Sequence, residues 1–341
     1  MPWTGTGRRL HVLRTKFCRQ SISVSFRYPA SKAIRVSSFI GAVHDHLTFG
    51  NPDVSVVILT KNCGRSLARC LDSVVAENPG EILAVDGFST DETLRILKDY
   101  DVKILRESND SLGYCRQLGV TAAEGDYVMF VDSDVELGKG CITTMRSELR
   151  KHGWVGIHAR FLSRENSTYW QRAEDEAFSL CRNHVGPTKW IATGAALFRR
   201  EVLLKHPFDP SMRAASEDRD LSHRLTQSSY CLGVSSAVAY HRHRRETRAF
   251  AKQRFRYGVG DARFYLKYKS IGELTNPFQS SVYFSIYCLV TNRVRLIPYW
   301  LVAGIFVFLG LLVGLSRAQH PSHGCSNGYV GTTTCGTTAC P

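Results

Sequence analysis

The sequence predicts an α/β fold in which helices flank a mostly parallel sheet, followed by interfacial helices and a C-terminal transmembrane helix. Three observations lead to this prediction. Apolar, β-branched runs alternate with helically spaced apolar residues between residues 53 and 240. Small polar and acidic residues follow the ends of several runs. An uncharged apolar stretch lies at 297–315, and its length suits one membrane-spanning helix.

The alternation is clearest in the first half of the chain. The run "VSVVILT" is typical of a buried strand, and the helical spacing of Leu67, Leu71 and Val74 predicts a helix after it. Repeated strand–helix–strand units favour a mostly parallel sheet with helices on both faces. In chain order, the predicted elements are strand 54–60, helix 65–77, strand 81–86, a helix capped by Ser89-Thr90-Asp91, strand 102–107, helix 112–124 and strand 127–132.

Polar residues gather where three of these strands end. They are Thr60-Lys61-Asn62, Asp86-Gly87 and Asp132-Ser133-Asp134. Ligands of such sheets bind beyond the carboxyl ends of the strands, so this arrangement points to an enzyme. The fingerprint GxGxxG is missing after the first strand, and GxxxxGK[ST] does not occur. The sequence therefore excludes an ordinary dinucleotide-binding or P-loop protein.

The charge of the chain is uneven. The formal net charge is +14, from 44 Lys and Arg against 30 Asp and Glu, and the surplus comes from residues 1–50 and 240–270. Such clusters fit nucleic acid, an anionic membrane surface or a phosphorylated substrate. The eleven cysteines form no CxxC pair, which argues against a zinc finger and favours a reducing compartment.

The two ends of the chain differ in character. Residues 1–50 are basic and aperiodic, so we expect a poorly ordered extension there. Residues 297–315 are expected to cross the membrane, and Arg293 and Arg295 before them would keep the large N-terminal part in the cytoplasm. A buried core helix is the alternative interpretation of this stretch. No structure is expected for the Gly- and Thr-rich tail at 316–341.

The two aspartates at the end of "YVMFVDSD" are candidate metal ligands. Side chains two apart in an extended chain point to the same side, so Asp132 and Asp134 face one point beyond the strand. Two close carboxylates repel each other unless a cation lies between them. Mg²⁺ or Mn²⁺ suits such an oxygen site, with water and substrate phosphates completing its shell. A solvated acidic turn is the alternative for an isolated Asp-x-Asp.

Residues 54–241 resemble the family-2 glycosyltransferases, which are inverting enzymes with the fold called GT-A. Several motifs occur in the family's order and cover a little over half of the chain. The sequence departs from the family at Gly87, where a second acid is usual, and at Gln117, where Asn is usual. The matching stretches are "VSVVILTKN", "LAVDGFSTDET", "SLGYCRQLGVTAAEGDYVMFVDSD", "TGAALFRREVL" and "SEDRDLSHRL".

The resemblance implies a divalent cation, Mn²⁺ or Mg²⁺, and a nucleotide-sugar donor. Asp134 is the first choice as metal ligand, and Asp132 contacts the ribose or a metal-bound water. His241, or less favourably His243, follows the run "LGVSSAVAY" where the family often has a histidine near the metal or diphosphate. A surface histidine in a basic patch is the alternative. A divalent ion at this point would neutralise charge on the leaving diphosphate.

The same resemblance assigns further donor contacts. Asp86 is expected to contact the nucleotide base, while Thr60 and Asn62 line the same pocket. Arg116 either reaches a phosphate or holds its helix to the neighbouring loop, and the sequence does not separate these two roles.

The acids Glu217 and Asp218 are the candidate catalytic residues on the acceptor side. An acceptor hydroxyl is a poor nucleophile until a base takes its proton. By resemblance, Asp218 is the general base and Glu217 orients it or touches the acceptor. Acids favoured by the dipole at a helix N-terminus are the alternative. Asp220 is expected to serve the structure.

The basic segment at 246–296 interleaves aromatic residues with Arg and Lys. We expect a pair of interfacial helices there, with long side chains reaching lipid phosphates; a solvated helix face is the alternative. With the family-2 domain at 51–245, this predicts a membrane-attached glycosyltransferase that acts on a lipid-linked or polysaccharide acceptor. A polyprenyl-phosphate sugar synthase of the same fold is the second hypothesis. An inactive membrane scaffold and a nucleic-acid binder are the non-enzyme hypotheses; the sequence holds no recognised nucleic-acid module.

Overall fold

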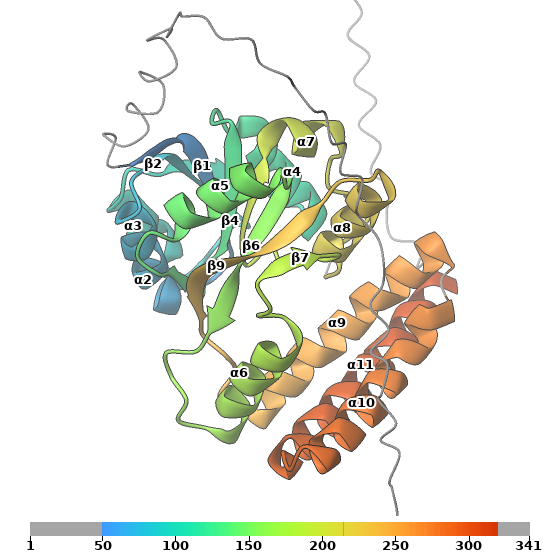
Figure 1. The fold of residues 1–341 in the computed structure, drawn as a ribbon. Helices are drawn as coiled ribbons and strands as arrows, with labels where there is room; N and C mark the ends of the chain where they lie inside the picture. Colours follow the sequence, from blue (N-terminus) through green and yellow to red (C-terminus); the bar gives the residue numbers. More distant parts are fainter. Residues whose placement is uncertain (1–49, 214, 270, 320–341) are drawn as a thin grey trace, which may run out of the picture. The chain divides into compact units, whose positions relative to one another are not determined.

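The computed structural model describes residues 50–213, 215–269 and 271–319. The expectations for residues 1–49 and for the tail from residue 320 onward lie outside the described residues. Within them, a sheet with the strand order β3-β2-β1-β4-β8-β6-β9-β5 forms the centre, and β7 pairs with β9. Helices cover the sheet, as Figure 1 shows, so the predicted α/β architecture is confirmed.

The first half of the sheet matches the predicted alternation. The strands β1 to β4 pair in parallel, and Thr60 of β1 lies beside Asp86 of β2 in the register. The predicted cap of α3 differs, because Glu92 occupies the N-cap position and Asp91 accepts hydrogen bonds from the amides of Thr93 and Gly64. The elements of this half are β1 (Asn51–Thr60), α2 (Gly64–Val75), β2 (Pro79–Asp86), α3 (Thr93–Lys98), β3 (Lys103–Arg106), α4 (Leu112–Ala122) and β4 (Tyr127–Asp132).

The second half of the sheet is largely antiparallel. Strand β8 pairs antiparallel with both β4 and β6, and β9 pairs antiparallel with β5 and β7 but parallel with β6. The sheet is therefore mixed, and the parallel arrangement is confined to its first half and to β6 with β9. The elements of this half are β5 (Val135–Leu137), α5 (Cys141–His152), β6 (Gly156–Leu162), α6 (Tyr169–Cys181), β7 (Gly186–Thr188), β8 (Ala195–Arg199), α7 (Arg200–Lys205), α8 (Glu217–Gln227) and β9 (Leu232–His241).

The short strand β5 determines where the two aspartates lie. Strand β4 lies inside the sheet, whereas β5 lies at its edge beside β9, with Val135 opposite His241. Only Ser133 and Asp134 connect the end of β4, at Asp132, to the start of β5. The amide of Arg242 donates to the carbonyl of Asp134 at 3.1 Å. This pairing brings the aspartates next to the end of β9.

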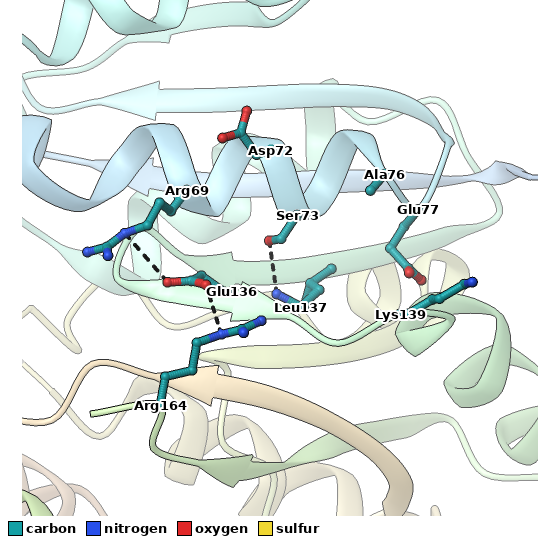
Figure 2. A pocket seen from close by; sticks show the side chains of 9 residues that line it. All are labelled: Arg69, Asp72, Ser73, Ala76, Glu77, Glu136, Leu137, Lys139 and Arg164. Carbon is teal, nitrogen blue, oxygen red and sulfur yellow. Dashed lines mark hydrogen bonds and ion pairs between the residues drawn. The ribbon is translucent and has the colours of Figure 1, made fainter. Parts of the chain in front are cut away.

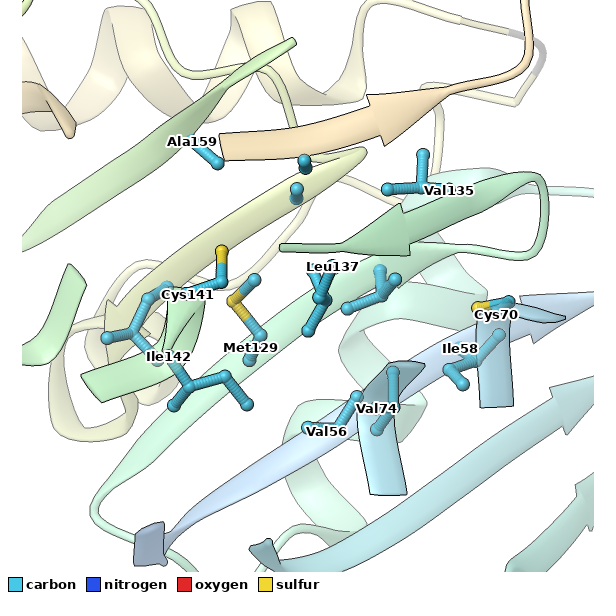
Figure 3. Close-up of a cluster of buried hydrophobic side chains, with 14 of the residues drawn as sticks. Val56, Ile58, Cys70, Val74, Met129, Val135, Leu137, Cys141, Ile142 and Ala159 are labelled. Atoms are coloured by element: carbon cyan, nitrogen blue, oxygen red, sulfur yellow. The ribbon is translucent and has the colours of Figure 1, made fainter. Parts of the chain in front are cut away.

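A buried apolar cluster supports this part of the sheet. Figure 3 shows side chains of β1 and β4, including Ile58 and Met129, packed with Cys70 of α2 and Ile142 of α5. These side chains are fully buried. Burial of each large aliphatic side chain stabilises the fold by about 1.5–3 kcal/mol. The packing of this cluster against β4 therefore fixes the position of the strand that ends in Asp132.

Three long helices follow the sheet domain. They are α9 (Thr247–Tyr268), α10 (Ile271–Val290) and, after a 3-10 turn at Val294–Leu296, α11 (Ile297–Gln319). Figure 1 shows α9 beside the sheet domain and α10 and α11 beyond it. Among the described residues, one helix, Val294–Arg317, is long and apolar enough to cross a membrane. The predicted apolar stretch at 297–315 lies within it.

The helix α9 differs from the expected interfacial helix. Its aromatic residues Phe250 and Phe264 are buried, and Arg254 is also buried, in an ion pair with Glu174 of α6. The sequence expectation placed these aromatic and basic side chains in the lipid headgroups. The structure instead packs them against the sheet domain and α11. The sequence did not distinguish these two environments, because a mixed aromatic and basic pattern suits both.

Candidate active site

A cavity of about 1370 Å³ lies between the sheet and the C-terminal helices. Its walls come from the loop after β4, the beginning of α8, the end of β9 and parts of α9, α10 and α11. Six of the residues predicted from the sequence line this one cavity: Arg116, Asp132, Asp134, Glu217, Asp218 and His241.

The buried Arg116 joins the two acidic pairs. Its side chain is 5% exposed, and its Nε donates to Glu217 Oε1 at 3.1 Å while an Nη donates to Asp132 Oδ1 at 3.3 Å. Burial by itself lowers the pKa of Arg116, but the carboxylates of Asp132 and Glu217 raise it above its ordinary value. The guanidinium is therefore charged and holds α4, the loop after β4 and the start of α8 together. Arg116 was expected either to reach a phosphate or to hold its helix to the neighbouring loop, and this geometry favours the structural role.

Removal of this cation is expected to destabilise the fold. Arg116→Met leaves the buried Glu217 and the carboxylate of Asp132 without their partner, so the free energy of unfolding should fall by about 3 kcal/mol. Urea unfolding of the purified variant measures this change. The matched control is Arg95→Met, which removes an exposed ion pair with Glu92 and should leave stability unchanged within error. Equal stability of both variants would show that Arg116 has no such structural role.

The side chains of Asp134, His241 and His243 lie next to one another in that order. Its Oδ1 is 3.6 Å from His241 Nε2, and His241 Nδ1 is 2.9 Å from His243 Nδ1. Arg244 also approaches Asp134, at 3.4 Å. Burial, together with the neighbouring His241, lowers the pKa of His243 to about 3, so this imidazole is neutral at physiological pH. A hydrogen bond between the two Nδ1 atoms requires that one donates and the other accepts.

This arrangement fits a divalent cation. If His241 donates through Nδ1 to His243, the Nε2 atom of His241 carries a lone pair on the side of Asp134. Histidine ligands of metals are commonly oriented in this way, by a hydrogen bond from their other ring nitrogen. Among the described residues, no group of three or more His, Cys, Asp and Glu side chains is arranged to hold a metal ion. Asp134 and His241 are the residues that would hold such an ion, with water and substrate oxygens as its remaining ligands. Mg²⁺ and Mn²⁺ commonly bind in this way.

The two acids of α8 have different surroundings. Both line the cavity, but Glu217 is buried and accepts from Arg116, whereas Asp218 is half-buried and accepts from the amide of Arg219 at 2.7 Å. Burial and the neighbouring Glu217 raise the pKa of Asp218 to about 7. A carboxylate with such a pKa can take a proton near neutral pH. Asp220 is fully buried and pairs with Arg224 and Lys267, a structural environment.

The three predicted nucleotide contacts lie apart from the cavity wall. Asp86 is fully buried and accepts from Thr60 Oγ1 at 3.0 Å and from both the amide and the hydroxyl of Ser89. Asn62 accepts from the amide of Thr90 at 2.9 Å. They occupy the ends of β1 and β2, on the side of β1 away from the loop after β4. The structure brings these three together but does not include them among the cavity-lining residues.

Sequence reasoning missed one wall of the cavity. Arg182 stacks over the ring of Trp190 at 4.5 Å, and both side chains line the cavity. Further along, the lining becomes apolar, with Phe284 of α10 stacked on Trp300 of α11 at 4.2 Å. Trp300 belongs to the apolar stretch that was expected to cross the membrane, so local spacing offered no signal that would place it beside the site.

A smaller pocket lies on another side of the sheet domain. It measures about 530 Å³ and lies between α2 and β5. Figure 2 shows Glu136 between Arg69 and Arg164, and Ser73 accepting from the amide of Leu137. These charged groups satisfy one another, and none of the predicted site residues lies there. The large cavity is therefore the candidate active site.

Comparison with known proteins finds relatives among the glycosyltransferases. Residues 55–206 match the profile of the family described as Glycosyl transferase family 2. The chain is 25% identical over 173 residues to the uncharacterized glycosyltransferase YibD of Escherichia coli strain K12, covering 45% of this chain and 50% of the relative. It is 29% identical over 108 residues to the poly(ribitol-phosphate) beta-N-acetylglucosaminyltransferase TarS of Staphylococcus aureus strain Mu50, covering 29% of this chain and 19% of the relative.

Among solved structures, the chain matches that of residues 1–349 of S. aureus TarS. The TM-score is 0.45 at 16% sequence identity, and the match covers 79% of this chain and 92% of that one. The chain spans half or less of the length of the curated relatives named above.

Proposed function

Since residues 55–206 carry a glycosyl transferase family 2 domain, we propose that the protein transfers a sugar from a nucleotide-sugar donor to a hydroxyl group of an acceptor, with inversion at the sugar carbon. One observation carries the proposal. The loop with Asp132 and Asp134 and the helix start with Glu217 and Asp218 line one cavity and share Arg116. A donor held by the first pair therefore lies within reach of a base in the second.

The proposed reaction is a single displacement. The acceptor oxygen attacks the anomeric carbon, the bond to the nucleoside diphosphate breaks on the opposite side, and Asp218 takes the acceptor proton. Glu217, fixed by Arg116, keeps the start of α8 in place. A bound Mn²⁺ or Mg²⁺ supplies neutralisation of the charge that develops on the leaving diphosphate. Asp134 and His241, with Asp132, are the residues that would hold this ion.

The donor's nucleotide is proposed to lie toward the ends of β1 and β2. Thr60, Asn62 and Asp86 gather there, one strand away from the loop of Asp132. Asp86 is enclosed by Thr60 and Ser89, so a direct contact with the base needs Ser89 to move. These residues do not line the cavity, so the proposed nucleotide would extend from the loop of Asp132 across the end of β1 toward β2.

The acceptor is proposed to be lipid-linked or a surface polysaccharide, and the protein to be attached to a membrane with its catalytic domain in the cytoplasm. The cavity wall changes from the polar side chains around Asp218 to the apolar pair Phe284 and Trp300, which suits an acceptor with a sugar head and a lipid tail. Seven cysteines among the described residues are free thiols, which supports a reducing compartment.

Three alternatives to this proposal remain. In a polyprenyl-phosphate sugar synthase of the same fold, a phosphate oxygen attacks, so Asp218→Asn should reduce the rate far less than with a hydroxyl acceptor. A nucleic-acid binder would use the cations of α9. Two of these, Arg254 and Lys267, are already paired with Glu174 and with Asp209 and Asp220, which disfavours it. An inactive membrane scaffold would bind no donor at all.

Turnover of labelled donors tests the proposed function. UDP-, GDP- and dTDP-sugars are offered separately with Mn²⁺ or with EDTA, together with membrane lipid extracts that supply lipid phosphate and lipid-linked sugar. We expect transfer from one class of donor that depends on Mn²⁺, and chromatography of the labelled product separates the two acceptor types. If all the donors stay intact under every condition, the proposed function is wrong.

A further inference from the structure

The helices α9 and α11 are built to touch along their length. A Cβ added at Gly258 of α9 would lie 1.9 Å from the carbonyl oxygen of Val307, and one at Gly310 of α11 would lie 2.0 Å from that of Phe255. A third close contact is between Gly314 and Ala262. The absence of side chains at these glycines lets the two backbones approach directly, as between closely packed membrane helices. The face of α11 that carries Gly310 and Gly314 therefore packs against α9.

The helix α9 is also attached to the sheet domain. Arg254 pairs with Glu174 of α6, Asp261 with Arg219 of α8, and Lys267 with Asp209 and with Asp220 of α8. At the start of α11, the hydroxyl of Tyr299 accepts a hydrogen bond from Arg254, and its amide donates to Tyr169 of α6. These bonds extend from Arg254 to Lys267 of α9. The helix α11 therefore runs alongside the catalytic domain instead of pointing away from it.

The remaining surface of α10 and α11 is apolar and exposed. On α11 the stripe repeats at helical spacing, with Leu301, Ile305, Leu309 and Leu312 each between 43% and 56% exposed. Most exposed large hydrophobic side chains of the described residues lie on this stripe, on α10 or in the turn between them, including Val282, Tyr283, Ile286, Leu289, Val290 and Val294. An apolar face of this extent marks an interaction surface.

The cations on the same helices indicate what covers this face. Arg248, Lys252 and Arg256 of α9 are exposed and each lies four positions after the last, and Arg256 also lines the large cavity. Arg295 before α11 is 77% exposed while it pairs with Glu176 of α6, and the exposed Arg317 follows the apolar stripe. Exposed Lys and Arg side chains beside an apolar surface complement a bilayer with anionic lipids.

We propose that α10 and α11 lie in the plane of one leaflet of an anionic bilayer, with only their exposed face in the lipid, and that α11 does not span the membrane. Contacts with α9 and α6 extend from Tyr299 to Gly314, about 24 Å of helix at 1.5 Å per residue. A spanning α11 would carry α9 and its domain contacts to the same depth. The cations Arg248, Lys252 and Arg256 would then enter the hydrocarbon, which is strongly unfavourable. This inference rests on the membrane attachment proposed above, but not on sugar transfer.

Topology in sealed vesicles tests the proposal independently of activity. The full chain, with one epitope tag at each terminus, is reconstituted into vesicles of phosphatidylcholine and phosphatidylglycerol, and protease is added outside. An in-plane arrangement predicts that each molecule keeps both tags or loses both, whatever its orientation. A spanning helix predicts that each molecule loses one tag and retains the other, which would overturn the proposal. Digestion after detergent addition is the control for protease access.

Two matched substitutions test which surface contacts lipid. Ile305→Glu introduces a charge on the exposed stripe, and Val185→Glu introduces the same charge at a position of equal exposure, 56%, on the sheet domain. We expect at least about a tenfold loss of vesicle binding for Ile305→Glu and none for Val185→Glu. Equal binding of both proteins would overturn the proposal. So would a wild-type dimer that Ile305→Glu converts to a monomer without loss of vesicle binding, because a second copy would then cover the face.

The docking of α11 on α9 has its own test. In a free spanning helix, Gly310→Ala raises helix propensity and should leave the domain's melting temperature unchanged or higher. In the docked arrangement the new Cβ meets the backbone of Phe255, so the melting temperature should fall by about 5 °C. Thermal unfolding in detergent solution, followed by circular dichroism, separates these signs. An unchanged melting temperature would contradict the docked arrangement even if the vesicle experiments agreed with it.

Discussion

Replacement of Asp218 by asparagine is expected to lower the rate of sugar transfer to a hydroxyl acceptor by about 10³-fold, while the protein remains folded. Asparagine keeps the size of the side chain but cannot take the acceptor proton, and the loss of a general base has an effect of about this size. Initial rates with the labelled donor measure it. The matched control Asp99→Asn, at an exposed site on α3's C-terminal side, should leave the rate unchanged.

The same residue should set the pH dependence of the reaction. Burial and the neighbouring Glu217 raise the pKa of Asp218 to about 7, so the base is protonated and inactive below that pH. The rate of the wild-type protein should therefore rise with pH up to about 7 and then level off, and this rise should be absent from the residual activity of Asp218→Asn. A wild-type rate that is constant between pH 5 and 8 would contradict the assignment.

Stability should change in the opposite direction to activity. In the folded state Asp218 holds its proton up to about pH 7, whereas the ordinary value of 3.8 applies when the chain is unfolded. The folded state thus binds more protons between these two values, so the contribution of Asp218 to stability falls as pH rises through this window. The melting temperature of Asp218→Asn should exceed that of the wild type at pH 8. Equal melting temperatures at that pH would show that the ionised carboxylate is not destabilising.

Replacement of Asp134 by alanine is expected to abolish metal-stimulated donor turnover. The substitution removes the carboxylate next to His241, and a lost metal ligand should lower turnover at saturating Mn²⁺ by at least about 100-fold. EDTA should reduce the wild type to the level of the variant and have no further effect on Asp134→Ala. The exposed Asp110→Ala is the control. Full, EDTA-insensitive turnover of Asp134→Ala would rule out the assigned ligand.

The sequence predicts those strands and helices that short apolar patterns along the chain mark directly. Strands β1, β2 and β4 are short apolar runs, and their parallel pairing follows from the helices between them. The position of Asp132 at a strand end follows in the same way. The antiparallel insertion of β8 beside β4 depends on residues 195–199 returning to a strand that lies far earlier in the chain, and no local pattern in either strand specifies that return.

The site shows the same limit. Glu217 and Asp132 lie far apart in the sequence, and neither is a neighbour of Arg116 along the chain. The sequence alone therefore could not decide whether Arg116 reaches a phosphate or holds its helix to a loop. The structure brings all three together within hydrogen-bond distance. The burial of α9 was missed for a related reason, since aromatic residues alternating with cations are equally suited to lipid headgroups and to a domain surface with acids such as Glu174 and Asp220.

The position of a bound metal and nucleotide tests the central claim most directly. Crystals of the full chain grown in detergent are soaked with Mn²⁺ and, separately, with UDP, GDP or dTDP, and the anomalous signal of manganese is recorded. The account predicts a manganese peak in coordination distance of Asp134 and His241 with at least one nucleotide, and its diphosphate on the cavity side that faces Asp218. A nucleotide-bound manganese at any other place, with none beside Asp134, would contradict it.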